Sequence, residues 1–142
     1  MFSIRVSSAA FGATLLFAAA PSAGAADSPL DIAVAKGARL FATATFDGNG
    51  RTCETCHQNG GKTPGQIGDR KLPSLLNAAA IFPRFSRGAG QVVTLEGQLQ
   101  TCVRGGLGGT PPQLGSPDLV ALTAYLGSIA NGQQIKIGGE PK

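Results

Sequence analysis

Apolar and small residues recur with helical spacing near both ends of the chain. The segment Asp27-Ser28-Pro29 offers a cap followed by a proline suited to the first helical position, so we expect a helix to begin there. Its apolar face is formed by Leu30, Ala33, Val34, Gly37, Leu40 and Phe41. Because Gly37 has no side chain, the face is narrow at this position, and we expect another helix to approach it closely. Asp47-Gly48-Asn49-Gly50 then breaks the pattern as a turn.

A second strong helical pattern begins at Ser116-Pro117-Asp118, which supplies a cap, a first-position proline and an acid near the positive end of the helix dipole. Its apolar stripe consists of Leu119, Leu122, Leu126 and Ile129, with Tyr125 alongside. The face bearing Gly37 and Phe41 is expected to cross this last helix near Tyr125. The tail after Asn131 is expected to be frayed.

Between these two helices, Thr94 is predicted to cap a helix in which Leu95, Leu99 and Cys102 lie on one face. Cys102 is therefore expected to point inward, and Gly105-Gly106 is expected to end the helix. A short helix is predicted at 73–80, before Pro83. The segments "QNGGKTPGQIGDR" and "RFSRGAGQ" are predicted as loops. Since no alternating segment of any length is present, we expect a small all-α fold of three to five helices with long loops.

The first residues of the chain have the pattern of an export signal. Arg5 precedes an apolar or small run from Val6 to Ala20, and Ala23-Gly24-Ala25 is acceptable to signal peptidase. We therefore predict a cleaved signal peptide at 1–25, a single domain at 26–142, and export to the periplasm. A retained N-terminal anchor is the alternative. Nothing else in the sequence predicts a stable membrane insertion.

Composition narrows the range of partners and suggests a bulky cofactor. The net charge of +4 is too low for the basic stripe of a nucleic-acid binder, so we expect no nucleic-acid partner. The chain has 21 glycines, no tryptophan and seven phenylalanines, so its core must be built mostly from small side chains. A large apolar group would fill such a core.

The stretch "RTCETCH" contains Cys53, Cys56 and the only histidine, His57. Cys-x-x-Cys-His is the attachment pattern of c-type haem, in which two thiols add to the vinyl groups on one edge of the porphyrin and the next residue binds the iron. Cys53 and Cys56 are thus predicted to hold one covalent haem c, with His57 as the proximal iron ligand. Export supplies a compartment in which haem is attached.

Three other interpretations of the same residues are open. A thioredoxin-like redox pair would need a βαβ context, which this chain lacks. A structural zinc site would need a further ligand, for which only Cys102 is available. A disulfide between Cys53 and Cys56 would leave His57 without a role.

The ligand on the other side of the iron is not obvious from the sequence. The chain has no methionine apart from Met1 and no second histidine. The candidates for the sixth coordination position of the iron are therefore Cys102, a lysine such as Lys62 or Lys71, and a weaker Asn or Tyr ligand. The remaining alternative is a position open to water or substrate. A thiolate is the strongest of these donors, and iron would favour deprotonation of Cys102. Alternatively, Cys102 is a small buried hydrophobe, or forms an intermolecular disulfide or carries another modification.

Two family resemblances support the haem assignment. Gly37 and Phe41, the Cys-x-x-Cys-His motif and Tyr125 resemble the N-terminal helix, haem motif and C-terminal helix of class I cytochromes c. The segments "IFPRF", "TLEGQLQTC" and "LVALTAYL" resemble the haem domains of the SoxA and thiosulfate dehydrogenase cytochromes, over roughly 36–126. That resemblance implies a cytochrome c fold and Cys102 as a distal thiolate opposite His57.

These observations predict a periplasmic monohaem cytochrome that passes single electrons to redox partner proteins at low potential, within inorganic sulfur oxidation. A thiosulfate-oxidising enzyme, or a haem subunit of one, is the alternative; a haem-based sensor or small-ligand binder is another. For a small sulfur anion, positive charge could come from Lys71, Arg84, Arg87 and Arg104. Members of the two sulfur families are generally longer and often carry two haem domains, whereas this chain has one haem motif.

Overall fold

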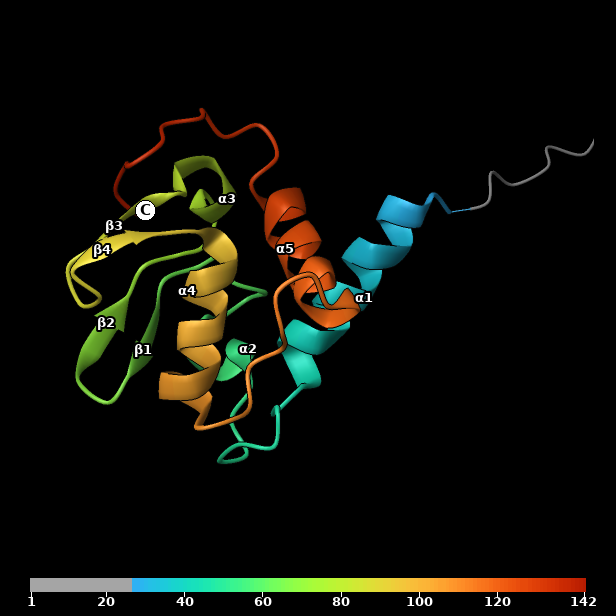
Figure 1. The fold of residues 1–142 in the computed structure, drawn as a ribbon, viewed down its shortest axis with the longest axis horizontal. Helices are drawn as coiled ribbons and strands as arrows, with labels where there is room; N and C mark the ends of the chain where they lie inside the picture. Colours follow the sequence, from blue (N-terminus) through green and yellow to red (C-terminus); the bar gives the residue numbers. More distant parts are fainter. Residues whose placement is uncertain (1–26) are drawn as a thin grey trace, which may run out of the picture.

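The computed structural model describes residues 27–142, so the predicted signal peptide lies outside the described residues. Two helices cross on one side of the molecule: α1 (Pro29–Thr43) and α5 (Pro117–Ile129) (Figure 1). Both begin as predicted, with the side chains of Ser28 and Ser116 accepting a backbone hydrogen bond and proline following. Among residues 27–142, no helix has the length and apolar character needed to cross a bilayer.

The crossing of α1 and α5 depends on Gly37. Gly37 and Phe41 are buried on α1, and a Cβ atom at Gly37 would lie 2.0 Å from the backbone oxygen of Ala121. The rings of Phe41 and Tyr125 pack at 5.4 Å between centroids, and Lys36 pairs with Asp118 at 2.7 Å across the same contact. The predicted close approach of the first and last helices is therefore confirmed.

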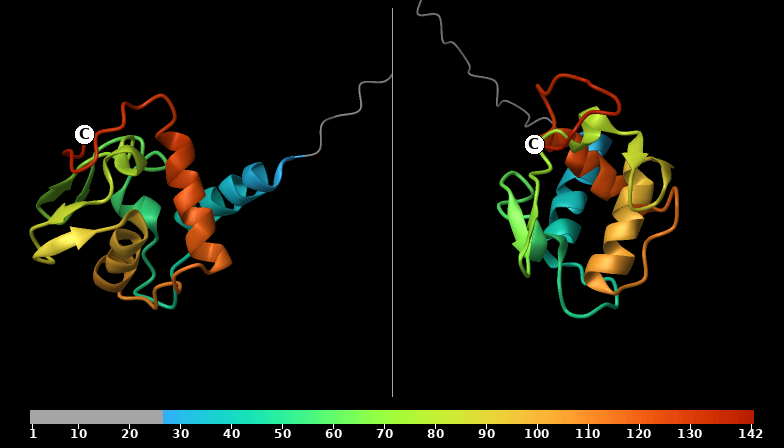
Figure 2. Two further views of the ribbon diagram at one scale, coloured as in Figure 1. Left: turned by 45° about the horizontal axis from the view of Figure 1, so that its top comes forward. Right: turned by 90° about the vertical axis from the view of Figure 1, so that its left-hand side faces the viewer.

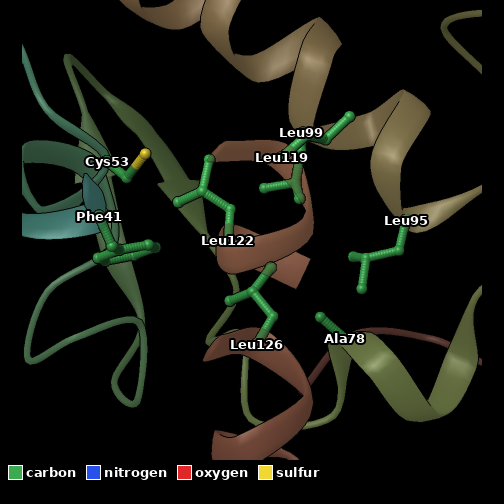
Figure 3. Close-up of a cluster of buried hydrophobic side chains, with 8 residues drawn as sticks. All are labelled: Phe41, Cys53, Ala78, Leu95, Leu99, Leu119, Leu122 and Leu126. Carbon is green, nitrogen blue, oxygen red and sulfur yellow. The ribbon is translucent and has the colours of Figure 1, made fainter. Parts of the chain in front are cut away.

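The hydrophobic core lies between α1, α5 and three shorter helices: α2 (Cys53–Cys56), α3 (Ala78–Ile81) and α4 (Leu95–Cys102). Figure 3 shows the three leucines of α5 between Phe41 and Cys53 on one side and the leucines of α4 on the other. The buried cluster is made of Phe41, Cys53, Ala78, Leu95, Leu99, Leu119, Leu122 and Leu126. Burial of these side chains, at about 1.5–3 kcal/mol for each large one, is the main force that holds the helices together.

The prediction of a strictly all-α fold is wrong in one respect. The first predicted loop contains an antiparallel hairpin of β1 (Gly65–Ile67) and β2 (Arg70–Leu72). The second contains a hairpin of β3 (Arg84–Ser86) and β4 (Gln91–Val93). Both hairpins lie on the side of the molecule away from α1 (Figures 1 and 2). Their three-residue strands are too short for alternation to be recognised in the sequence.

The helix that carries Cys102 does not stop at Gly105-Gly106. It begins at the predicted cap, where the Thr94 side chain accepts a bond from Gly97 N, and continues after Cys102 as a π-helical turn, η1 (Val103–Leu107). It ends at Gly108, which has a left-handed φ of 63°. The side chains of Val103 and Leu107 are buried, so their packing extends the helix past the two glycines.

The C-terminal segment, residues 133–142, is packed rather than frayed. It returns over α3, where Lys136 N donates to Ala80 O at 2.8 Å and Gly138 N donates to Ile81 O at 2.9 Å. The buried side chain of Asn77 accepts from Lys142 N at 3.2 Å and donates to Glu140 O at 3.0 Å. Because a buried amide needs such partners, these bonds fix the segment against the domain.

Candidate functional site

A cavity of about 550 Å³ lies between α2, α4 and the two hairpins, within the usual size range of cofactor pockets. All four residues singled out from the sequence line it: Cys53, Cys56, His57 and Cys102. Most of the remaining wall is apolar, and includes Phe41, Leu72, Ile81, Leu95, Leu99 and Leu126. The fold thus brings a local five-residue motif and one distant cysteine to a common pocket.

Cys53 and Cys56 occupy the two ends of the single-turn helix α2, and both are buried. Thr52 caps the turn, and its N–H donates to the Thr55 hydroxyl at 3.0 Å. Burial raises the pKa of Cys53 to about 12, and nearby Cys102 acts in the same direction. This rise in pKa favours the neutral thiol form of Cys53 at neutral pH.

His57 follows α2 directly, and its backbone N–H donates to the backbone oxygen of Cys53 at 2.9 Å. Its Nδ1 atom is buried and has no hydrogen-bond partner among the described residues. Burial lowers the pKa of His57, while the backbone carbonyl of Pro73 acts to raise it. The lowered pKa favours the neutral form of this partly buried imidazole, and a neutral ring with one nitrogen lacking a partner has the protonation state that metal ligation requires.

Cys102 ends α4 and is partly buried. Its Sγ accepts a hydrogen bond from Gln98 Nε2 at 3.4 Å. Burial raises the pKa of Cys102, and the Gln98 bond and the positive charge of Arg70 act against that rise. All three cysteines are free thiols, so the disulfide between Cys53 and Cys56 that the sequence left open is not formed here.

The positive charge at the cavity differs from the set expected from the sequence. Arg70 and Arg84 line the cavity, whereas Lys71, Arg87 and Arg104 are exposed and do not. Arg84 pairs with Glu140 of the C-terminal segment at 3.2 Å, and its Nε atom is buried with no partner in the part of the chain described. A buried N–H of this kind can donate to an anionic group inside the cavity.

The loop after His57 is fixed through the peptide of Gly60. Both carboxylate oxygens of Glu54 accept from Gly60 N at 3.0 Å, and the Tyr125 hydroxyl donates to Gly60 O at 2.8 Å. Gly60 itself has a left-handed φ of 63°. Helix α5 thereby holds the loop that follows His57 against the core.

Replacing Tyr125 with phenylalanine tests this link. The ring packing on Phe41 is retained while the bond to Gly60 O is lost, so we expect the free energy of unfolding to fall by about 1 kcal/mol. Urea denaturation followed by circular dichroism measures the change. The control is Ser128→Ala, because the Ser128 hydroxyl makes only a local exposed bond to Tyr125 O. Equal stabilities of the two variants would contradict the role of Tyr125.

No group of three or more His, Cys, Asp and Glu side chains within 27–142 is gathered closely enough to hold one metal ion. The zinc alternative therefore finds no support in this geometry. The four cavity residues instead surround a space large enough for an organic cofactor.

The helix crossing, the Cys-x-x-Cys-His turn and the cavity that they border define a cytochrome c domain. The profile of the SoxA/TsdA cytochrome c domain matches residues 36–135, so the chain belongs to this family. The resemblance expected from the sequence is confirmed. Membership implies covalently bound haem c.

Individual relatives agree with this assignment. A thiosulfate dehydrogenase of Allochromatium vinosum is 28% identical over 88 residues, which cover 61% of this chain and 32% of the relative. The structure of thiosulfate dehydrogenase TsdBA from Marichromatium purpuratum superposes with a TM-score of 0.65 at 27% identity, over 83% of this chain and 26% of that one. SoxXA from P. pantotrophus shares the fold, with a TM-score of 0.61 at 19% identity, over 77% and 36%. The chain thus spans about a third or less of the first two proteins.

Sequence reasoning missed Gln98, Arg70 and the covering role of the C-terminal segment, whose Pro141 lines the cavity. For Gln98 a signal was present, because residues four apart on a helix face each other and Cys102 was already placed on that helix. For Arg70 no signal was present, since it lies in a short hairpin that has no periodic pattern.

Proposed function

We propose that this chain is a periplasmic cytochrome that carries one covalent haem c and transfers single electrons at low potential, within inorganic sulfur oxidation. The observation that carries the proposal is the meeting of Cys53, Cys56, His57 and Cys102 at one largely apolar cavity. The cytochromes named above, two of them thiosulfate dehydrogenases, support the link to sulfur chemistry. The apolar N-terminal run supports export.

The residues around the cavity fit haem in three ways. Cys53 and Cys56 lie one helical turn apart at its wall, where each S–H can add across one vinyl double bond without loss of any atom. His57 has a neutral imidazole to offer the iron, with the Pro73 carbonyl available to orient the ring. The unpartnered Nε of Arg84 suits a propionate carboxylate.

When bound, haem supplies the one-electron redox couple of iron. The protein's contribution is to set the ligands and the surroundings of that iron. His57 and Cys102 would hold the iron, and electron donation from the Cys102 thiolate would stabilise ferric iron and so lower the reduction potential. The apolar wall and the C-terminal segment limit access of water to the site. Redox partner proteins would dock transiently over a small interface.

Changing Cys102 to alanine tests the ligation. Purified ferric holoprotein is expected to show a low-spin spectrum with a near-infrared thiolate charge-transfer band, and Cys102→Ala is expected to lose that band because no thiolate remains. Absorption and electron paramagnetic resonance spectra measure the effect. Arg104→Ala is the matched control, since Arg104 is exposed two residues further on. A ferric spectrum unchanged by Cys102→Ala would refute thiolate ligation.

A second candidate function is turnover of a small sulfur anion at the haem site. It is favoured by Arg70, which lines the cavity and acts electrostatically on Cys102. Thiosulfate-dependent haem reduction, measured with and without candidate partner proteins, separates the two functions. Reduction that is lost in Arg70→Ala, with the thiolate band intact, supports an enzyme or enzyme subunit. No turnover under any condition supports the carrier.

A further inference from the structure

One side chain on α4 makes a direct contact with the sulfur of Cys102. Gln98 lies four residues before Cys102, one helical turn away, and both side chains line the cavity. Gln98 Nε2 lies 3.4 Å from Cys102 Sγ, a hydrogen-bonding distance for a sulfur acceptor, and the bond is partly buried. The protein itself therefore supplies an N–H donor to the Cys102 sulfur.

The neighbouring amide on the same helix is used differently. Gln100 Nε2 donates to Pro112 O at 2.8 Å and so serves the loop that leads to α5. Gln100 does not line the cavity, whereas Gln98 does. The side chains of Gln98 and Gln100 thus face different directions, and of the two only Gln98 donates a hydrogen bond to the Cys102 sulfur. This difference provides a matched pair for experiment.

We propose that Gln98 is a positioning residue for the Cys102 thiolate: it holds the Cys102 side chain at the cavity and, with iron bound, would weaken electron donation from the sulfur by hydrogen bonding. Hydrogen bonds to a ligating sulfur are one of the means by which a protein sets a metal's reduction potential. A thiolate that accepts a hydrogen bond donates less electron density to iron and so stabilises the ferric state less. The Gln98 bond would therefore raise the reduction potential above the value expected for a thiolate ligand without a hydrogen bond. The inference rests on the proposed ligation by His57 and Cys102.

Arg70 also places positive charge near this sulfur, but its effect has a different character. Arg70 is exposed on β2, so its interaction is weakened as ions screen it. The Gln98 amide is uncharged and in direct contact with Sγ, so its effect is expected to be nearly independent of ionic strength. Salt dependence therefore separates the two contributions.

The test compares holoprotein carrying Gln98→Leu, Gln98→Glu or the control Gln100→Leu. Gln98→Leu removes the donor. Gln98→Glu replaces it with a carboxylate of nearly the same shape, so the test can still be made if the leucine variant misfolds. We expect the ferric state to be favoured several-fold to tenfold over wild type in both, where tenfold corresponds to about 59 mV for one electron. The near-infrared thiolate band should shift as well, and Gln100→Leu should leave both measurements unchanged.

Spectroelectrochemical titration at low and high salt measures the potential, and covalent haem content verifies that each variant is assembled. Unchanged potentials and thiolate bands in both Gln98 variants would overturn the role of Gln98 while leaving the ligation intact. If wild type itself lacks a thiolate band, the proposed ligation fails instead. In a Cys102→Ala background, substitution of Gln98 should no longer change the potential; an equal shift there would also overturn the inference.

Discussion

Substitution of Gly37 by alanine is expected to destabilise the protein by about 3 kcal/mol or more, at or above the top of the typical range for overpacked cores. The added Cβ would lie 2.0 Å from the backbone oxygen of Ala121 and 2.7 Å from Tyr125 Cβ. Relief would require α1 and α5 to separate, because the first of these atoms belongs to backbone that cannot rotate away. Separation would also loosen the buried contacts of Phe41. Since domains of this size are stable by about 5–15 kcal/mol, the loss is a large fraction of the total.

Thermal and urea denaturation of the variant, followed by circular dichroism, measures this effect. The control is Gly127→Ala on α5, where an added Cβ would meet no atom within 4 Å. Alanine is favoured over glycine inside a helix by up to about 1 kcal/mol, so this control should be slightly more stable than wild type. A Gly37→Ala protein that unfolds at the wild-type temperature would show that the helices do not cross as described.

The helix crossing could be predicted from the sequence because each of its parts has a local signal. Caps followed by prolines fix where α1 and α5 begin, and Gly37 and Phe41 lie four apart on the apolar face of α1. The two hairpins have no such signal. Their strands are three residues long and rich in polar residues, and isolated two-stranded hairpins are marginal without packing against the rest of the domain. Tertiary contacts therefore decide their conformation.

The site shows the same division between local and distant information. Cys53, Cys56 and His57 were recognisable because their spacing in the chain already carries the chemistry. The inward position of Cys102 followed from its helical spacing with Leu95 and Leu99. The packing of residues 133–142 could not be foreseen, because backbone bonds to Ala80 and Ile81 require no particular side chains in the segment. Arg84 was noticed as a charge, but its link to Glu140 is a contact 56 residues away in the chain.

Replacing both Cys53 and Cys56 with alanine is expected to abolish covalent haem attachment. Thioether bonds need the two sulfurs, and both are buried at the wall of the cavity with no other thiol on α2 to substitute for them. Because the Gly/Ala-rich chain has few large side chains to fill about 550 Å³ of its interior, loss of the haem should also leave a less stable protein. Each single variant retains one sulfur and should carry haem at lower yield.

Peroxidase-active staining after denaturing electrophoresis measures attachment, since only covalently bound haem stays with the chain, and intact mass confirms it. The matched control is Cys102→Ala, which also removes a thiol from the cavity but is expected to keep the stain, because this sulfur is proposed to bind iron rather than a vinyl group. A double variant that stains as strongly as wild type would refute attachment through Cys53 and Cys56. Loss of the stain in Cys102→Ala alone would instead move Cys102 from the iron to the covalent linkage, and so reverse the roles assigned to the three cysteines.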